Sequence, residues 1–395
     1  MITMQHKFFI GLFLLSLGFT AQERTNKKES DYKFTVVKDI ENTPVQNQNQ
    51  TSTCWSFSSL SFFESEMIRL GKGKAPIDIG VNLSEMFVVN KVYSLKADNY
   101  IRMHGKTNFG EGGGFPDAIN VLRNYGMVPE DVYSGKKDLA APHNHKMLET
   151  TLKNILLPTS LDETQKIDFS FLHNTVAAVC DEYLGKAPEK FEYKGKTYTP
   201  KTYAEATGLN PDDYIFLTSF SHHPYYTPFV LEIPDNWNWQ TTYNLPLNEF
   251  KEVMNNAITT GYTFAWGADV SEKGFMRADG LAIIPENYTG KLTDDERKNM
   301  SVKPMKQMEI TQEIRQKAFD NYDTQDDHGM HVVGLVKDQN NTPYYIVKNS
   351  WGKESNQCDG YFYASESYVL YKTTSIMLHK KALTPAIAKK LGITL

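Results

Sequence analysis

Apolar residues recur at helical spacing directly after Cys54. The positions that carry this pattern lie three or four residues apart: Leu60, Phe63, Met67 and Leu70. Such a period places them on one face of a helix. Ser52 and Thr53 are residue types that cap helix starts, and Gly71 and Gly73 favour helix termination. The pattern therefore predicts a buried helix that begins near Cys54 and ends near residue 70.

In the C-terminal half, short apolar runs separated by turn residues predict β-strands. They cover residues 262–268, 331–336, 344–348, 361–364 and 374–379, and a helical pattern at 247–258 precedes them. The sequence Asp-Gln-Asn-Asn at 338–341 is typical of a turn between two strands. We therefore expect an antiparallel pair in which the start of one strand lies beside the end of the next.

These patterns predict an α+β fold with a helical lobe and an antiparallel, β-barrel-like lobe. We expect the helical lobe over residues 22–150, a mixed insertion over 151–245, a β-rich lobe over 246–380 and a C-terminal tail over 381–395. Five prolines between residues 200 and 234 predict loops and short elements in the insertion.

The first 21 residues have the pattern of a signal peptide. Lys7 provides positive charge, and an apolar run over residues 8–19 follows it. The run is too short to span a bilayer, and the small residues near Ala21 suit cleavage. We expect a mature chain that begins near Gln22, is exported to the periplasm or secreted, and has no membrane anchor.

The composition narrows the class of protein. Hydrophobic residues make up 40% of the 395 positions, which is enough for a substantial core. The net charge of −5 and the absence of a dense Lys/Arg stripe argue against nucleic-acid binding. With only Cys54, Cys180 and Cys358, a disulfide framework is not expected, and Cys180 is predicted to be a core thiol.

Cys54 is the candidate nucleophile. At the start of a helix, the positive end of the dipole and the free amide groups stabilise a thiolate. Gln48 precedes Cys54 on a loop, where its side-chain amide can donate a hydrogen bond to the same place. A lone cysteine at a helix start is more often a small buried apolar residue, so this assignment depends on the rest of the chain.

His328 and Asn349 supply the other groups that a thiol nucleophile needs. His328 precedes one predicted strand and Asn349 follows the next. Antiparallel pairing would bring a general base beside the residue that orients it. His331 is the competing base, and two residues three apart on a strand face opposite sides, so only one of the two can face Cys54. The residues after His328, a small one and an aliphatic one, resemble those after the catalytic histidine of a known peptidase family, and on this resemblance we assign His328 as the base.

In combination, these segments resemble the papain-like cysteine peptidases. The shared motifs are Gln48 followed by Cys54-Trp55, the strand that begins at His328, and Asn349-Ser350-Trp351-Gly352. Other segments are similar to one branch of that family, the bleomycin hydrolase and aminopeptidase C group. They are residues 83–85, 111–118, 124–129, 218–224 and 266–272. The resemblance covers nearly all of the chain after the signal peptide.

The resemblance implies a cysteine peptidase that uses a Cys-His-Asn mechanism on peptide substrates and needs no cofactor. It implies that Gln48 and the backbone N–H of Cys54 stabilise the oxyanion, and that a thiolate–imidazolium pair is the resting state. Gly113, Gly114 and Trp351 would bind the substrate. The two glycines would pair with an extended peptide, and Trp351 would also shield the His–Asn contact. It also implies aminopeptidase activity and a homo-oligomer, which is a hexamer in that branch.

Other functions fit the sequence less well. The histidine clusters at 143/145, 222/223 and 328/331 lack the spacing of a helical zinc site, so no metal is expected. His143 and His145 are predicted to be solvated. Acyltransferases of the transglutaminase type share Cys-His chemistry but lack the preceding Gln and the Asn-Ser-Trp-Gly motif. A peptide-binding protein with an inactive site would not require the complete set of residues.

The C-terminal segment leaves the mode of cleavage open. In the resembled branch, a C-terminal arm lies in the cleft and its carboxylate holds the free amine of the substrate. Here Thr384-Pro385 predicts the start of a short helix, Gly392 its end, and residues 393–395 follow. The breadth of the resemblance favours an aminopeptidase, and the alternative is an endopeptidase with an open cleft.

Overall fold

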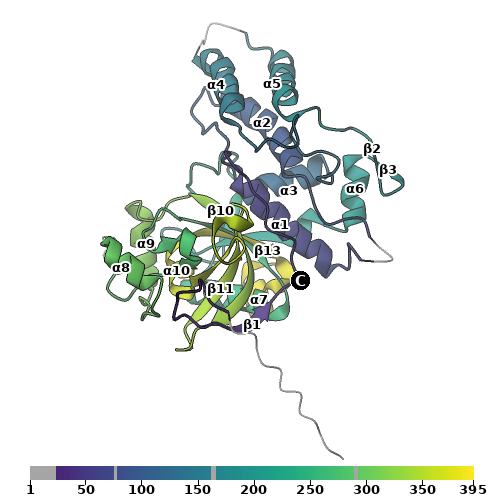
Figure 1. The fold of residues 1–395 in the computed structure, drawn as a ribbon. Helices are drawn as coiled ribbons and strands as arrows, with labels where there is room; N and C mark the ends of the chain where they lie inside the picture. The colour runs from purple at the N-terminus through teal and green to yellow at the C-terminus, as the bar shows by residue number, and fades with distance from the viewer. Residues whose placement is uncertain (1–23, 75–77, 162–165, 289–291) are drawn as a thin grey trace, which may run out of the picture.

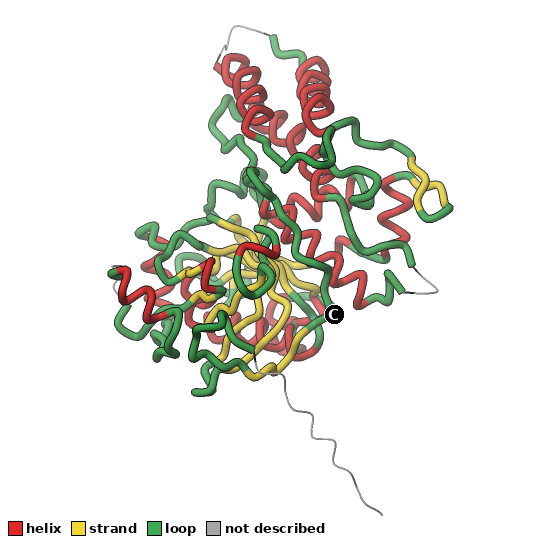
Figure 2. The backbone as a smooth tube through the Cα atoms, viewed as in Figure 1, coloured by secondary structure: helices red, strands yellow, loops and turns green. Residues whose placement is uncertain are grey.

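The computed structural model describes residues 24–74, 78–161, 166–288 and 292–395. The predicted signal peptide, residues 1–21, lies outside the described residues. Helices and strands separate into two lobes, with most strands gathered in one of them (Figures 1 and 2). This arrangement confirms the predicted α+β fold class.

The described helices are α1 (Cys54–Arg69), α2 (Glu85–Arg102), α3 (Phe115–Asn124), α4 (Lys146–Leu161), α5 (Phe169–Leu184), α6 (Pro200–Thr207), α7 (Leu247–Thr260), α8 (Asp294–Met300), α9 (Gln312–Asp320), α10 (Glu366–Lys372) and α11 (Pro385–Leu391). The described strands are β1 (Thr35–Asp39), β2 (Phe191–Tyr193), β3 (Lys196–Tyr198), β4 (Tyr214–Thr218), β5 (Pro228–Val230), β6 (Thr241–Asn244), β7 (Phe264–Ala268), β8 (Phe275–Met276), β9 (Leu281–Ala282), β10 (His328–Lys337), β11 (Pro343–Lys348), β12 (Tyr361–Ser365) and β13 (Thr373–His379).

The main sheet runs in the order β5-β6-β4-β13-β7-β10-β11-β12-β9-β8, and β1 also pairs with β10. All pairs are antiparallel except β4 with β6 and β9 with β12. The predicted strands are confirmed to within a few residues. The turn after β10 forms as expected, because the Asp338 carboxylate accepts hydrogen bonds from the backbone of Asn340 and Thr342 at 2.8 and 2.9 Å.

The predicted insertion, residues 151–245, contributes to both lobes. Helix α5 packs against α2 and α4 in the helical lobe. Strands β4, β5 and β6 extend the main sheet instead. The chain therefore crosses between the lobes within this segment, which brings part of it to the boundary where the candidate site lies.

Helix α1 lies between the two lobes (Figure 1), in contact with β10 and β7 on one side and α2 and α3 on the other. Its residues from 55 to 67 are all buried. Thr53 occupies the N-cap position, but its side chain does not cap the helix. Its hydroxyl pairs instead with that of Thr51 at 2.7 Å. The predicted helix is confirmed, and the side-chain cap is not.

The C-terminal segment folds as the sequence predicts. Thr384 caps α11, and Gly392 ends it in the left-handed conformation at a φ of 67°. Apolar residues of α11 join the core beneath the sheet, and Lys390 forms an ion pair with Glu249 of α7 at 2.7 Å. Among the described residues, no helix is both long enough and apolar enough to cross a membrane.

The three cysteines are free thiols. Cys180 has no exposed surface and lies in the core of the helical lobe, as predicted. Cys358 is half-buried, with its sulfur 2.9 Å from the carbonyl oxygen of Asn26. Cys54 is half-buried as well, and its surroundings differ from those of the other two thiols.

Candidate active site

Cys54 is the first residue of α1 and lies in the wall of a pocket between the lobes. A backbone hydrogen bond from Gly329 reaches its thiol. Gly329 follows the first residue of β10, so the sulfur lies where the helix start meets the strand start. His328 lines the same pocket. The fold thus brings together two candidate residues that are 274 positions apart in the sequence.

His328 is held by the residue that the sequence predicts. Its Nε2 lies 2.8 Å from Oδ1 of Asn349. That oxygen also accepts a hydrogen bond from the backbone N–H of Ser350 at 2.8 Å, which fixes the amide orientation. Because Asn349 presents an acceptor, Nε2 carries the ring proton and Nδ1 is the basic nitrogen.

Trp351 covers the histidine ring. The two rings stack with centroids 4.5 Å apart and an interplanar angle of 21°. His328 is buried beneath it. Trp351 does not line the pocket beside Cys54. Its ring instead covers the face of His328 and shields the His–Asn contact.

His331 has a different environment. It is buried between β10 and α1, with Nδ1 2.8 Å from the hydroxyl of Ser61. It does not line the pocket that contains Cys54. Its position agrees with the expectation that two residues three apart on a strand face opposite sides.

Gln48 is fixed by the segment that carries Asn349. Its backbone N–H donates to the carbonyl of Ser350 at 2.8 Å, and the Ser350 hydroxyl donates to Gln48 Oε1 at 2.6 Å. Gln48 Nε2 donates to the carbonyl of Thr51 at 2.7 Å. Because a primary amide has two N–H donors, a second one remains for a substrate oxygen.

The glycine segment before α3 lines the pocket opposite His328. A Cβ added at Gly113 would lie 2.9 Å from the Trp55 ring and 2.8 Å from the Asp117 carboxylate. The indole N–H of Trp55 donates to the carbonyl of Glu111 at 2.9 Å, which ties this segment to α1. The N–H groups of Gly113 and Gly114 are bound to the carboxylates of Asp235 and Asp117, the latter at 3.0 Å. Because neither residue has a side chain, an extended peptide can still approach this segment closely.

Burial acts against the charged form of each member of the Cys54–His328 pair. Burial, together with the charges of Asp235 and Asp326, raises the pKa of the Cys54 thiol to about 12, and the backbone hydrogen bond from Gly329 opposes this rise. Burial also lowers the pKa of His328 to about 4, with the nearby Arg277 acting in the same direction and the hydrogen bond to Asn349 opposing it. A thiolate and an imidazolium side by side would stabilise each other, so the thiolate–imidazolium resting state stays a prediction.

Four aspartates line the pocket, and none was among the predicted site residues: Asp117, Asp235, Asp326 and Asp327. Asp235 belongs to the insertion, and Asp326 immediately precedes Asp327-His328. Their approach to Cys54 depends on long-range packing that no local pattern encodes. The two adjacent aspartates before His328 were the signal in the sequence for Asp326. The Asp327 carboxylate accepts hydrogen bonds from the backbone of Val270 and Ser271.

The expectation that His143 and His145 are solvated is wrong, since both are buried. His143 packs against Phe57, and the backbone around both histidines pairs with Gln50. This loop therefore closes over the residues that precede α1.

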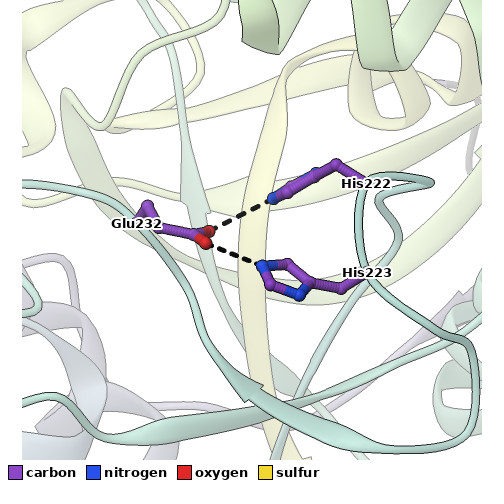
Figure 3. A group of neighbouring side chains, drawn as sticks. All are labelled: His222, His223 and Glu232. Carbon is purple, nitrogen blue, oxygen red and sulfur yellow. Dashed lines mark hydrogen bonds and ion pairs between the residues drawn. The ribbon is translucent and has the colours of Figure 1, made fainter.

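His222 and His223 converge on Glu232, as Figure 3 shows. Their Nε2 atoms lie 3.2 and 2.7 Å from the two carboxylate oxygens. Gln316 Nε2 lies 3.0 Å from Nδ1 of His222, while Gln316 Oε1 accepts from the backbone of Ser221. The amide is thus oriented as a donor to Nδ1, so Nε2 carries the proton that faces Glu232. A metal would require Nε2 without its proton, and the geometry fits a hydrogen-bonded cluster.

Comparison with known proteins agrees with this arrangement. Residues 84–393 match the Peptidase C1-like family, and because this match covers most of the chain, the protein belongs to that family. Aminopeptidase C of Lactococcus lactis subsp. lactis strain IL1403 is 24% identical over 398 aligned positions, covering 88% of this chain and 83% of the relative. Aminopeptidase C of Streptococcus thermophilus is 22% identical, with coverages of 92% and 86%.

The crystal structure of PepW from Lactobacillus rhamnosis HN001 superposes with a TM-score of 0.69 at 20% identity, covering 91% of this chain and 84% of PepW. The predicted papain-like fold and cysteine peptidase class are therefore confirmed. The family match begins at residue 84. The roles of Gln48 and Cys54, which precede it, thus depend on the geometry of the pocket.

Proposed function

We propose that the protein is a thiol aminopeptidase that hydrolyses peptides with Cys54 as nucleophile, His328 as base, Asn349 as orienting residue and Gln48 as oxyanion donor. The observation that carries this proposal is that Cys54 and His328 line one pocket, while His328 is hydrogen-bonded to Asn349 behind it. The relatives named above support the aminopeptidase assignment.

The chemistry follows from the positions of the atoms. Nδ1 of His328 takes the proton of Cys54, and the sulfur attacks the carbonyl carbon of the scissile bond. The oxyanion forms beside the backbone N–H of Cys54 and the free N–H of Gln48. His328 returns its proton to the leaving amine as the C–N bond breaks. A water molecule, activated by the same ring, then hydrolyses the thioester.

The glycine segment supplies the substrate-binding surface in this proposal. An extended peptide that pairs with the backbone at Gly113 and Gly114 would direct its scissile carbonyl toward Cys54. Trp351 would then lie on the side of the departing amine.

Selective labelling tests the assignment of the nucleophile. An epoxide or iodoacetamide-type alkylator should modify Cys54 before Cys180, which is fully buried, and before Cys358. Cys54→Ala should abolish peptide hydrolysis, while the matched control Cys358→Ala should retain it. Hydrolysis that persists in Cys54→Ala would remove Cys54 from the mechanism.

Export and assembly are also part of the proposal. The pattern of residues 1–21 supports export from the cytosol, and N-terminal sequencing of the mature protein tests it. The resemblance to the bleomycin hydrolase branch supports a homo-oligomer, with a hexamer as the expected size. Light scattering of the purified mature protein distinguishes a hexamer from a monomer.

A further inference from the structure

One wall of the Cys54 pocket comes from the insertion, at residues 231–242. This segment is fixed to the helical lobe by Asp117, which is buried at the start of α3. The Asp117 carboxylate accepts hydrogen bonds from the indole N–H of Trp237 at 3.0 Å and from Asn238 Nδ2 at 3.1 Å. The insertion therefore closes the part of the pocket beyond the glycine segment and bounds the length of peptide that fits there.

Asp235 points from this wall onto the glycine segment. Its Oδ1 accepts a hydrogen bond from Asn108 at 2.8 Å, and the backbone of Gly113 also donates to the carboxylate. A Cβ added at Gly112 would lie only 2.4 Å from Asp235 Oδ2. The carboxylate can thus reach this position because residue 112 has no side chain.

Asp326 faces the same pocket from the other lobe and is half-buried. Within the described ranges, no hydrogen-bond donor and no ion-pair partner lies on its carboxylate. Burial and the neighbouring Asp235 and Asp327 raise its pKa to about 8. Lys96 partly offsets the charge of Asp235, but its ammonium group is already bound to the carbonyls of Gly110 and Gly112. A positive charge placed beside Asp326 would therefore favour its carboxylate form, and no cation in the part of the chain that the structure describes forms an ion pair with Asp326.

We propose that Asp235 and Asp326 bind the free α-ammonium group of the peptide substrate and thereby set the aminopeptidase specificity of the enzyme. This inference rests on the proposed function, since it places the ammonium group in the pocket where Cys54 attacks. An ammonium group offers three N–H donors and a positive charge, which complement two carboxylates on facing walls. No residue of 381–395 lines this pocket, so the anchor comes from the insertion and from the segment before β10.

The proposal also connects substrate binding to the nucleophile. The charges of Asp235 and Asp326 raise the pKa of Cys54. A bound ammonium group would offset their charge and lower the cost of forming the thiolate. Substrates with a free N-terminus would thus favour the proton transfer from Cys54 to His328, in addition to binding in the correct place.

Paired fluorogenic substrates provide the test. Each pair has the same small neutral side chains and the same leaving group, and its members differ only in a free or an acetylated N-terminus. Asp235→Asn and Asp326→Asn should each lower kcat/KM for the free substrate by about 10- to 100-fold, because a charge-assisted contact is lost. Cleavage of the acetylated partner should be unchanged or increased.

Two matched variants separate charge from structure. Glu232→Gln removes a carboxylate three residues from Asp235 that faces His222 and His223 (Figure 3), and it should leave the free-to-acetylated ratio unchanged. Gly112→Ala keeps both carboxylates but displaces Asp235, and it should lower the ratio. An acetylated substrate with a lysine side chain tests the other source of an ammonium group. If Asp235→Asn and Asp326→Asn lower the cleavage of this lysine substrate alone, the site binds a side-chain ammonium group and the proposal is wrong.

Alkylation kinetics provide a second readout. Asp235→Asn removes a negative charge, so the pKa of Cys54 should fall and the pH profile of alkylation should move to lower pH. An unchanged ratio and an unchanged profile in both Asn variants, with Cys54 still fully titratable, would overturn the proposal. A wild-type enzyme that is labelled at Cys54 but cleaves neither free nor acetylated peptides would instead overturn the proposed function.

Discussion

At the scale of single residues, the position of one proton determines which atom acts as the base. Asn349 presents its oxygen to Nε2 of His328 because the backbone of Ser350 donates to that same oxygen. Nδ1 is left as the acceptor for the thiol proton. Burial lowers the pKa of the ring to about 4, and the hydrogen bond to Asn349 opposes this shift.

The two histidines of β10 should respond differently to the same substitution. We expect His328→Gln to lower kcat/KM by about 10³-fold or more, since the general base is lost. The glutamine of His331→Gln can keep a hydrogen bond to Ser61, so kcat/KM of this variant should stay within about tenfold of wild type. Rates on a free-N-terminus substrate, compared at equal amounts of folded enzyme, check this prediction. If His331→Gln lowers kcat/KM more than His328→Gln does, the base is His331 and not His328.

Gln48 should contribute to the transition state more than to substrate binding. We expect Gln48→Ala to lower kcat by about 10²- to 10³-fold with little change in KM, because the oxyanion exists only after attack. Ser350→Ala removes the hydroxyl that orients the Gln48 amide and should have the same signature with a smaller effect. Steady-state kinetics of both variants provide the measurement, and an unchanged kcat in Gln48→Ala contradicts the assignment.

At the scale of elements, the site depends on the close contact of α1 with β10. The sequence predicted both elements because their apolar patterns are long and regular. It could not predict that His143 and His145 are buried, since their burial depends on a loop 90 residues earlier in the chain. Asp235 was missed for a related reason. It lies in an irregular segment whose position is set by Trp237 and Asn238 binding to Asp117.

A substitution at Gly329 tests the contact between α1 and β10. A Cβ at this position would lie 2.7 Å from the hydroxyl oxygen of Ser58 and 3.3 Å from Cα of Trp55. Gly329→Ala should therefore push β10 away from α1 and displace His328 from Cys54. Misplacements on the order of 1 Å can cost about 10²-fold in rate, so kcat should fall by about 10- to 100-fold.

Far-ultraviolet circular dichroism and thermal unfolding would show whether the Gly329→Ala variant remains folded. Ser58→Ala removes the nearest atom in the clash. The double variant should therefore recover part of the lost activity. Full activity in the single variant would show that the helix and the strand can separate without harm to catalysis.

At the scale of the whole molecule, the insertion links the two lobes and limits the cleft between them. Its helices join the helical lobe, its strands join the main sheet, and the segment at 231–242 closes the pocket. A papain-like cleft could otherwise accept an extended chain on both sides of the scissile bond. The position of this segment favours an enzyme that acts at the end of a peptide.

The C-terminal tail should not control this selectivity. Helix α11 packs into the core beside α7, and Leu395 is 42% exposed. The bleomycin hydrolase branch would assign the amine-binding role to a C-terminal carboxylate, whereas the pocket here contains Asp235 and Asp326. Deleting residues 393–395 should therefore leave the ratio of free to acetylated substrate cleavage within about twofold of wild type. The reason is that changes at distant, independent sites rarely affect one another. Deleting only residues 394–395 keeps the packing of Ile393 and controls for a loss of stability. If either deletion lowers the ratio as strongly as Asp235→Asn does, the tail reaches the cleft and the amine is held by its carboxylate.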